Sequence, residues 1–391
     1  MERTNSNNIS NIGVIIIGGD HHNTLSVIRS FGRKKIDYKV IIHTKEKEKR
    51  NLMIYHSRFG KNLFLVDDNE KSILNCLINI KNVNKQVIIS CSDLSQFTID
   101  NNYGLLKEYY LISGYNNKPG LVVSMMNKIN QKKWAEERKI PMAKSWNVDI
   151  ADAHRKVKEI EFPCIIKPNI SAFGQKSDIA ICNNEIDFDK SIDDFKNKKY
   201  KNVIIQKFIK KDYEVCALGA IINNNAKNIG AVIKKDRENP PTGGGSLTFA
   251  HFIDDERINE MVYHVITELY KENYRGLYDI EFLVLGNEIY LNEINFRNSG
   301  NNYALVKYGI DAPYLYYLNT IDKNTNLNIK IRKRKNYFMD ELNELVLLRN
   351  GFISFWTFIK EFIKAKSYAK LDVGDLGIVT FMIKKAFRGK K

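Results

Sequence analysis

Short apolar runs alternate with longer mixed segments near the start of the chain. The run 14–17 ends at a Gly-Gly-Asp turn, a helical pattern continues to Arg29, and a second apolar run covers 38–42. A further run, QVIIS, follows at 86–90. Strands that alternate with helices predict an α/β unit with a parallel sheet, whose end we place near residue 120. The first turn lacks a GxGxxG pattern, so a dinucleotide site finds little support.

Residues 280–296 carry charged side chains inside otherwise apolar strand patterns, on both sides of a Gly-Asn turn signal. This alternation predicts a β-hairpin. A two-residue turn would place Glu281 opposite Asn292, whereas a three-residue turn would place it opposite Glu293, because a slip of one residue reverses the face of each side chain. With the three-residue turn, one face of the hairpin holds four polar side chains: Glu281, Glu293, Asn295 and Arg297.

Two facing carboxylates repel each other unless a positive charge lies between them. Mg²⁺ takes oxygen ligands, commonly one or two carboxylates together with phosphate oxygens. Glu281, Glu293 and the amide oxygen of Asn295 could therefore hold a metal, and Arg297 could bind a phosphate or an oxyanion with two N–H groups. The alternative is an acidic solvent face with Arg297 in a surface ion pair. Apolar side chains on the same face (Leu283, Leu285, Ile289 and Leu291) argue against that alternative.

Three other segments carry candidate chemistry. Lys167 ends an apolar run just before a loop with Ser171, Gly174 and Ser177, where a lysine and loop N–H groups could hold phosphate, although strand-end lysines are commonly just exposed. The stretch QKFIKKDYE (206–214) could bind a base through backbone groups and a ribose through a carboxylate, or be an ordinary hairpin. The stretch 234–249, with two prolines and three glycines in a row, is either a linker or a mobile lid.

The amino-acid composition excludes several classes of protein. The 391 residues carry a formal net charge of +16 and 43% hydrophobic residues, which is typical of a globular protein. The five cysteines show no CxxC pair, so zinc is not expected. No zinc-finger or RRM signature indicates dedicated nucleic-acid binding, and we attribute the charge to lysine-rich solvated faces. The start of the chain is polar, so we expect a cytoplasmic protein.

The segment FISFWTFIKEFIKAK (352–366) has aromatic and aliphatic residues at helical spacing with lysines between them. We favour a helix that packs on the protein's own core. The alternative is a basic amphipathic helix on an anionic membrane, which would make a lipid-linked cell-wall or capsule precursor a natural acceptor.

The order and spacing of these segments resemble the ATP-grasp superfamily. Lys128 on a helix before an Ile-Pro pair and Lys167 in IIKP match that family's two nucleotide lysines, QKFI matches its adenine hinge, and Glu281, Glu293 and NEINFR match its metal-binding strand pair. The resemblance covers about residues 1–325 and is strongest to carboxylate–amine ligases of the D-aspartate ligase type. It implies an α/β (α+β) fold with a Rossmann-like pre-ATP-grasp domain at 1–120, a small lobe at 121–200, a large lobe at 201–325 and a basic C-terminal extension at 326–391.

The resemblance also implies a reaction. ATP and Mg²⁺ (or Mn²⁺) would activate a small-molecule carboxylate as an acyl phosphate, and an amine would displace the phosphate. The implied metal ligands are Glu281, Glu293 and Asn295, and the implied catalytic residues are Arg297 with Lys234, Lys235 or Arg237 on the lid. The implied nucleotide contacts are Lys128, Lys167, Gln206, Lys207, Phe208, Ile209, Asp212 and Glu214. Ligases of this kind are often dimers, and the sequence leaves open whether this protein is a homodimer. Two other functions stay open: phosphoryl transfer without an amide product, and a non-catalytic protein that docks on membrane or nucleic acid.

Overall fold

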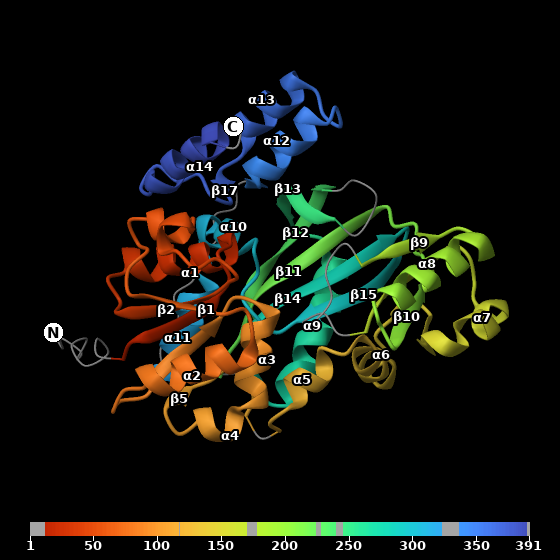
Figure 1. Ribbon diagram of the computed structural model, residues 1–391, viewed down its shortest axis with the longest axis horizontal. Helices are drawn as coiled ribbons and strands as arrows, with labels where there is room; N and C mark the ends of the chain where they lie inside the picture. Colours follow the sequence, from red (N-terminus) through yellow and green to blue (C-terminus); the bar gives the residue numbers. More distant parts are fainter. Residues whose placement is uncertain are drawn as a thin grey trace.

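The computed structural model of the protein describes residues 12–116, 118–169, 178–223, 228–239, 245–322 and 336–388. Within these residues the strands form three sheets, one in each of three successive parts of the chain (Figure 1). The predicted loop around Ser171, Gly174 and Ser177 lies outside the described residues, as does residue range 240–244 of the predicted lid. The α/β fold with an N-terminal unit and two lobes is confirmed.

The N-terminal domain is a five-stranded parallel sheet in the order β3-β2-β1-β4-β5. Its central strands β1 and β4 are buried along their whole length because helices cover both faces of the sheet. The strands are β1 (Val14–Gly18), β2 (Tyr38–His43), β3 (Leu63–Val66), β4 (Gln86–Ser90) and β5 (Tyr110–Leu111); the helices are α1 (His22–Arg33), α2 (Glu70–Ile80), α3 (Asp93–Asn101) and α4 (Tyr103–Leu106), with 3₁₀ turns η2 (Lys49–Asn51) and η3 (Ile54–His56). The α1 and α3 N-termini follow β1 and β4 directly.

The small lobe is a four-stranded antiparallel sheet in the order β7-β10-β8-β9. Its strands are β7 (Ser145–Asp149), β8 (Cys164–Pro168), β9 (Ala180–Cys182) and β10 (Asn202–Lys207); its helices are α7 (Ala153–Lys156) and α8 (Glu185–Asn197), with 3₁₀ turns η4 (Ile150–Asp152) and η5 (Val157–Glu159). The predicted boundary at residue 200 is therefore too early, because β10 pairs with both β7 and β8. The preceding α5 (Leu121–Met125) and α6 (Lys128–Glu137) contribute Val122 and Trp134 to the large-lobe core instead.

The large lobe is an eight-stranded sheet whose main path runs β15-β14-β11-β12-β13-β16-β17, with β6 beside β14. The strands are β6 (Gly114–Tyr115), β11 (Tyr213–Ile221), β12 (Asn228–Asn239), β13 (Ser246–Ile253), β14 (Tyr274–Leu285), β15 (Glu288–Asn295), β16 (Tyr337–Met339) and β17 (Ser367–Tyr368); the helices are α9 (Glu256–Lys271), α10 (Asn302–Tyr308) and α11 (Ala312–Ile321). The predicted lid stretch 234–249 consists, where described, mostly of β12 and β13.

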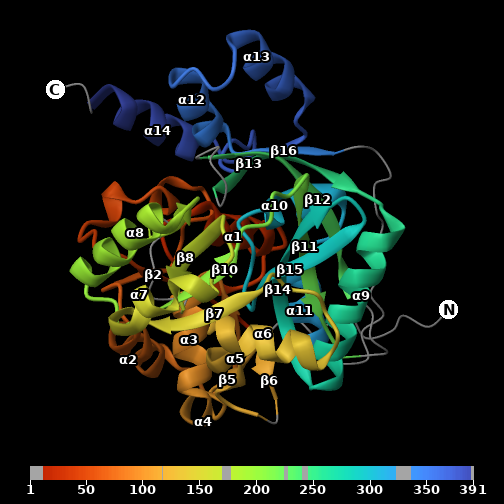
Figure 2. The ribbon, with the colours of Figure 1, turned by 90° about the vertical axis from the view of Figure 1, so that its right-hand side faces the viewer.

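The C-terminal segment, predicted as an extension, is joined to the large lobe by β16, which pairs with β13 in the large sheet. Its helices α12 (Glu341–Arg349), α13 (Phe355–Lys364) and α14 (Gly377–Arg388) form the outermost layer of the molecule (Figures 1 and 2). The segment also reaches the N-terminal domain, where Arg29 donates to Asp375 at 2.8 Å and both side chains are fully buried. No helix in the described part of the chain is both long and apolar enough to cross a bilayer.

The favoured packing of the aromatic helix holds for only part of α13. Phe358 and Phe362 pack beside Phe249 and Met339. Phe355 and Trp356, in contrast, face outward and are 57% and 77% exposed.

Candidate active site

The β14–β15 hairpin brings Glu281 and Glu293 face to face by a route that differs from the prediction. The turn has two residues, because Leu285 pairs with Glu288, and the three-residue turn is wrong. Phe282 pairs with Leu291, and a β-bulge at Asn292 then shifts the register so that Glu281 pairs with Glu293. A bulge inserts one unpaired residue and redirects the side chains beyond it. The two carboxylates therefore share a face although the turn alone would have separated them.

These carboxylates lie in a crowded, desolvated row. Burial, with Glu214, Asp279 and Glu293 nearby, raises the pKa of Glu281 to about 7. Burial also raises the pKa of Asp279. A divalent cation would relieve this repulsion, and Mg²⁺ prefers oxygen ligands. The residues present therefore fit a metal at Glu281, Glu293 and Asn295. Cys216 lies within 4.8 Å of Asp279 and Glu281, but burial raises the pKa of its thiol, and a neutral thiol is a poor ligand for Mg²⁺.

Arg297 is fixed at the end of the same strand pair. Its guanidinium donates to Asp93 at 3.0 Å and to Asp279 at 3.3 Å. Burial lowers the pKa of Arg297, but these carboxylates outweigh burial and raise the net pKa, so the group stays charged. Asp93 begins α3 in the N-terminal domain, so Arg297 connects the acid hairpin with that domain.

Two lysines face the acid hairpin from the opposite side. Lys128 begins α6 and its ammonium donates to Glu293 at 2.7 Å. Lys167 on β8 donates to the amide oxygen of Gln206 at 2.8 Å. Burial and the neighbouring Lys128 lower the pKa of Lys167 to about 8. Two cations held this close to each other would gain from a polyanion between them.

The predicted hinge leaves the small lobe at the end of β10. Gln206 and Lys207 end the strand, and Phe208 and Ile209 follow along the wall of the cavity. The Phe208 N–H donates to the Pro163 carbonyl at 2.9 Å. The amide oxygen of Gln206 already accepts from Lys167, so its role in reading adenine stays a prediction.

The structure separates the two predicted ribose acids. Glu214 is buried on the cavity wall and accepts from Lys211 at 2.5 Å and Lys235 at 2.7 Å. Burial raises the pKa of Glu214, but the attraction of both lysines outweighs it and the net pKa is lowered. Asp212 lies outside the cavity wall and accepts from the Gly286 N–H at 2.7 Å, so it supports the hairpin turn instead.

The three candidate residues of the predicted lid lie in different places. Lys235 lines the cavity, whereas Lys234 places its ammonium 4.2 Å from the centre of the Tyr213 ring. Arg237 forms ion pairs with Glu344 on α12 and Glu361 on α13, and does not line the cavity. Lys234 and Arg237 are therefore poorly placed for the predicted role, while Lys235 is well placed for it.

A single cavity of about 620 Å³ lies between the small lobe, the large sheet and the N-terminal domain. It joins eleven predicted site residues: Lys128, Lys167, Gln206, Lys207, Phe208, Ile209, Glu214, Glu281, Glu293, Asn295 and Arg297. Sequence reasoning missed several further lining residues: Asp93, Lys211, Asp279, Asp340 and Asn343. Asp93 and Asp340 lie far from the hairpin in sequence, so only tertiary contact could reveal them. His21 and His22 also line this cavity.

Comparisons with known proteins agree with this arrangement. Residues 133–305 match the ATP-grasp domain family. Formate-dependent phosphoribosylglycinamide formyltransferases from Saccharolobus solfataricus and Sulfurisphaera tokodaii are 28% and 25% identical over 182 residues, which is 44% of this chain and 45% of each relative. The chain thus spans less than half the length of these curated relatives.

Solved structures show the same fold over a longer span. N5-carboxyaminoimidazole synthetase from Staphylococcus aureus, complexed with ADP, covers 87% of this chain and 85% of its own, with a TM-score of 0.62 and 17% identity. The biotin carboxylase domain of the Hydrogenobacter thermophilus 2-oxoglutarate carboxylase covers 83% and 73%, with a TM-score of 0.63 and 14% identity. Residues 133–305 thus match an ATP-grasp domain, and the fold of the described residues is the one that these solved structures share.

Proposed function

We propose that the protein is an ATP-dependent carboxylate–amine ligase that forms an amide bond through an acyl phosphate. The observation that carries this proposal is the cavity between the two lobes, on which the side chains of Glu281, Glu293, Arg297, Lys128 and Lys167 converge. The curated relatives support it, because their names couple formate, a carboxylate, to transfer onto phosphoribosylglycinamide. The D-aspartate ligase type and a role in cell-wall or capsule precursor synthesis are finer proposals.

The residues suit the two chemical steps. In the first, a substrate carboxylate oxygen attacks the γ-phosphorus of ATP, the bond to the β-phosphate oxygen breaks, and ADP leaves. Lys128 and Lys167 would hold the phosphates as their charge redistributes, which is the main requirement of phosphoryl transfer. Mg²⁺ (or Mn²⁺) on Glu281, Glu293 and Asn295 would supply further charge neutralisation at the phosphates.

In the second step, an amine nitrogen attacks the acyl carbon, phosphate leaves, and the nitrogen loses its proton to give the amide. Arg297 keeps its charge between Asp93 and Asp279 and lies on the cavity wall, where it could stabilise the oxyanion that develops on the acyl oxygen. The small-molecule carboxylate and amine would enter beside Arg297. The cavity wall offers polar side chains to such substrates, among them Asn23, Ser246, Asn301 and Asn343.

The test is phosphate release from Mg·ATP with amino acids, dipeptides and muropeptide-like acceptors. We expect release that needs both an acid and an amine, and that Glu293→Gln lowers by at least about 100-fold. Glu288→Gln is the matched control, because Glu288 is exposed at the turn of the same hairpin. Release with one acceptor alone would replace the ligase by a phosphotransferase. ATP binding without release on any acceptor would favour a non-catalytic protein.

A further inference from the structure

We propose that the outward face of α13 is a docking surface for anionic membrane, independent of the ligase reaction. The exposed residues, which we call the α13 face, are Phe355, Trp356, Lys360 and Ile363 on the helix, together with Phe352 just before it and Lys366 just after it. The four apolar side chains are 59%, 57%, 77% and 70% exposed. Monomeric proteins rarely expose several large apolar side chains together without a partner.

The helix α13 is attached to the rest of the protein by the side chains on its inner side. Phe358 and Phe362 already pack beside Phe249 and Met339. The negative charge of Glu361 is neutralised on the inner side of the helix, because its carboxylate accepts from Arg237 at 2.8 and 2.9 Å. The helix is therefore anchored to the protein through one side, while a second apolar stripe points away from it.

The exposed charges within residues 352–366 are of one sign. Between residues 352 and 366 the chain has three lysines and one acid, and that acid is Glu361, which is paired inward. Lys360 and Lys366 are exposed. Basic residues next to exposed aromatic side chains suit anionic headgroups, which attract lysine and admit tryptophan and phenylalanine at the acyl boundary.

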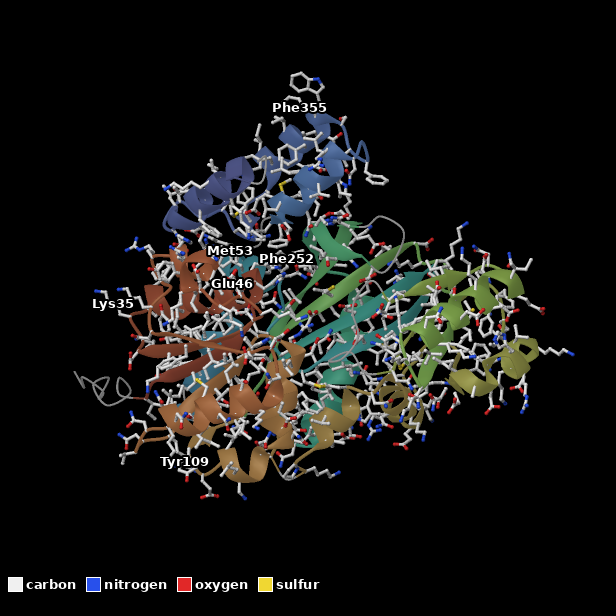
Figure 3. All side chains as sticks on the ribbon, viewed as in Figure 1. Lys35, Glu46, Met53, Tyr109, Phe252 and Phe355 are labelled. Atoms are coloured by element: carbon white, nitrogen blue, oxygen red, sulfur yellow. The ribbon has the colours of Figure 1, made fainter. Side chains whose placement is uncertain are left out.

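The shape of the molecule favours a lipid surface over a protein partner. The helix α13 stands at the outer edge of the C-terminal layer in both ribbon views, and Phe355 lies at the tip of that layer (Figures 1, 2 and 3). A protruding helix can lower its side chains into a bilayer, whereas a stable protein interface needs a broad complementary surface of roughly 1,000 Å² or more.

The experiment is co-sedimentation of the full-length protein with vesicles of phosphatidylcholine, with and without 30% phosphatidylglycerol. We expect about tenfold more protein on the anionic vesicles, and a loss of that difference at high salt. Phe355→Ser with Trp356→Ser should abolish binding. Ile186→Ser with Tyr263→Ser is the matched control, because these side chains are 80% and 58% exposed on other helices. Lys360→Glu with Lys366→Glu should remove the preference for anionic lipid.

Fluorescence of Trp356 gives a second readout. Its emission should shift to the blue on anionic vesicles, and Trp356→Phe should abolish the shift but keep sedimentation. Equal recovery on both vesicle types would overturn the proposal. So would a homodimer that these serine substitutions dissociate, because the α13 face would then be covered by a second copy of the chain.

Discussion

Lys234 and Lys235 are neighbours in the sequence, yet their ammonium groups lie on opposite faces of β12. Lys235 contacts Glu214 at 2.7 Å on the cavity wall, and Lys234 lies over the Tyr213 ring. Side chains alternate across a strand, so only one of the two can reach the cavity. We expect Lys235→Met to weaken Mg·ATP binding at least about tenfold, because a charge-assisted hydrogen bond is lost.

Lys234→Met is the matched control and should change the dissociation constant by less than about threefold, because its ammonium is directed at a ring. Isothermal titration calorimetry measures both constants. If both variants lost affinity for Mg·ATP equally, β12 would have to change its position when the nucleotide binds.

Lys167 gives a pH dependence whose sign follows from its environment. Burial and Lys128 lower its pKa to about 8, so the ammonium is charged below pH 8 and neutral above it. The attraction for phosphate is therefore complete at low pH and is lost as the pH rises. We expect ATP affinity to fall above pH 8, by up to about tenfold per pH unit. Lys167→Arg should remove this dependence, since arginine stays charged. Calorimetry from pH 7 to 9.5 tests it, and a wild-type affinity that is flat over this range would contradict the expectation.

The acid hairpin is the element on which the proposed metal site depends. Gly286 has φ of +57° in the two-residue turn, a conformation that costs little for glycine and more for other residues. Its N–H donates to Asp212, and the turn fixes the pairing of Leu285 with Glu288. The turn and the bulge together set the position of Glu293.

We expect Gly286→Ala to lower the free energy of unfolding by about 1 kcal/mol, because an added Cβ meets open space and only the backbone is strained. Gly104→Ala in α4 is the control. Its added Cβ also meets open space, and alanine is the better helix former, so stability should stay or rise. Urea denaturation measures the free energy of unfolding of both variants. An unchanged denaturation midpoint for Gly286→Ala would show that the turn can take another conformation.

At the scale of the whole molecule, the C-terminal segment holds the domains together. Asp375 accepts from Arg29 at 2.8 Å, from the Ser57 hydroxyl at 2.7 Å and from the Arg58 N–H at 2.8 Å. Asp375→Asn would leave a fully buried guanidinium without its counter-charge. We expect a loss of about 3 kcal/mol in the free energy of unfolding.

Glu159→Gln provides the comparison, because Glu159 pairs with Lys156 on the surface at 3.1 Å and should contribute less than about 0.5 kcal/mol. Denaturant unfolding measures both. A similar small effect for Asp375→Asn would mean that the N-terminal domain and the C-terminal segment are not coupled through this pair.

The sequence by itself determined the class of fold and pointed to eleven of the residues that line the cavity. Alternation of apolar and polar residues is a local property, so the strand at 14–17, the acid hairpin and Lys167 could be read directly from the chain. The sequence also identified Glu281, Glu293, Asn295 and Arg297 as candidates for one polar face, although it left the hairpin register open.

Only the tertiary structure decided the rest. The bulge at Asn292 was not visible in the alternation, because it depends on how β15 pairs with its neighbour. Asp93 reaches Arg297 from another domain, and Asp340 and Asn343 complete the cavity from the C-terminal segment. The choice between Lys234 and Lys235 followed from the pairing of β11 with β12, in which Lys235 lies opposite Glu214. Contacts between distant residues depend on how whole elements pack, and a local pattern carries no information about that packing.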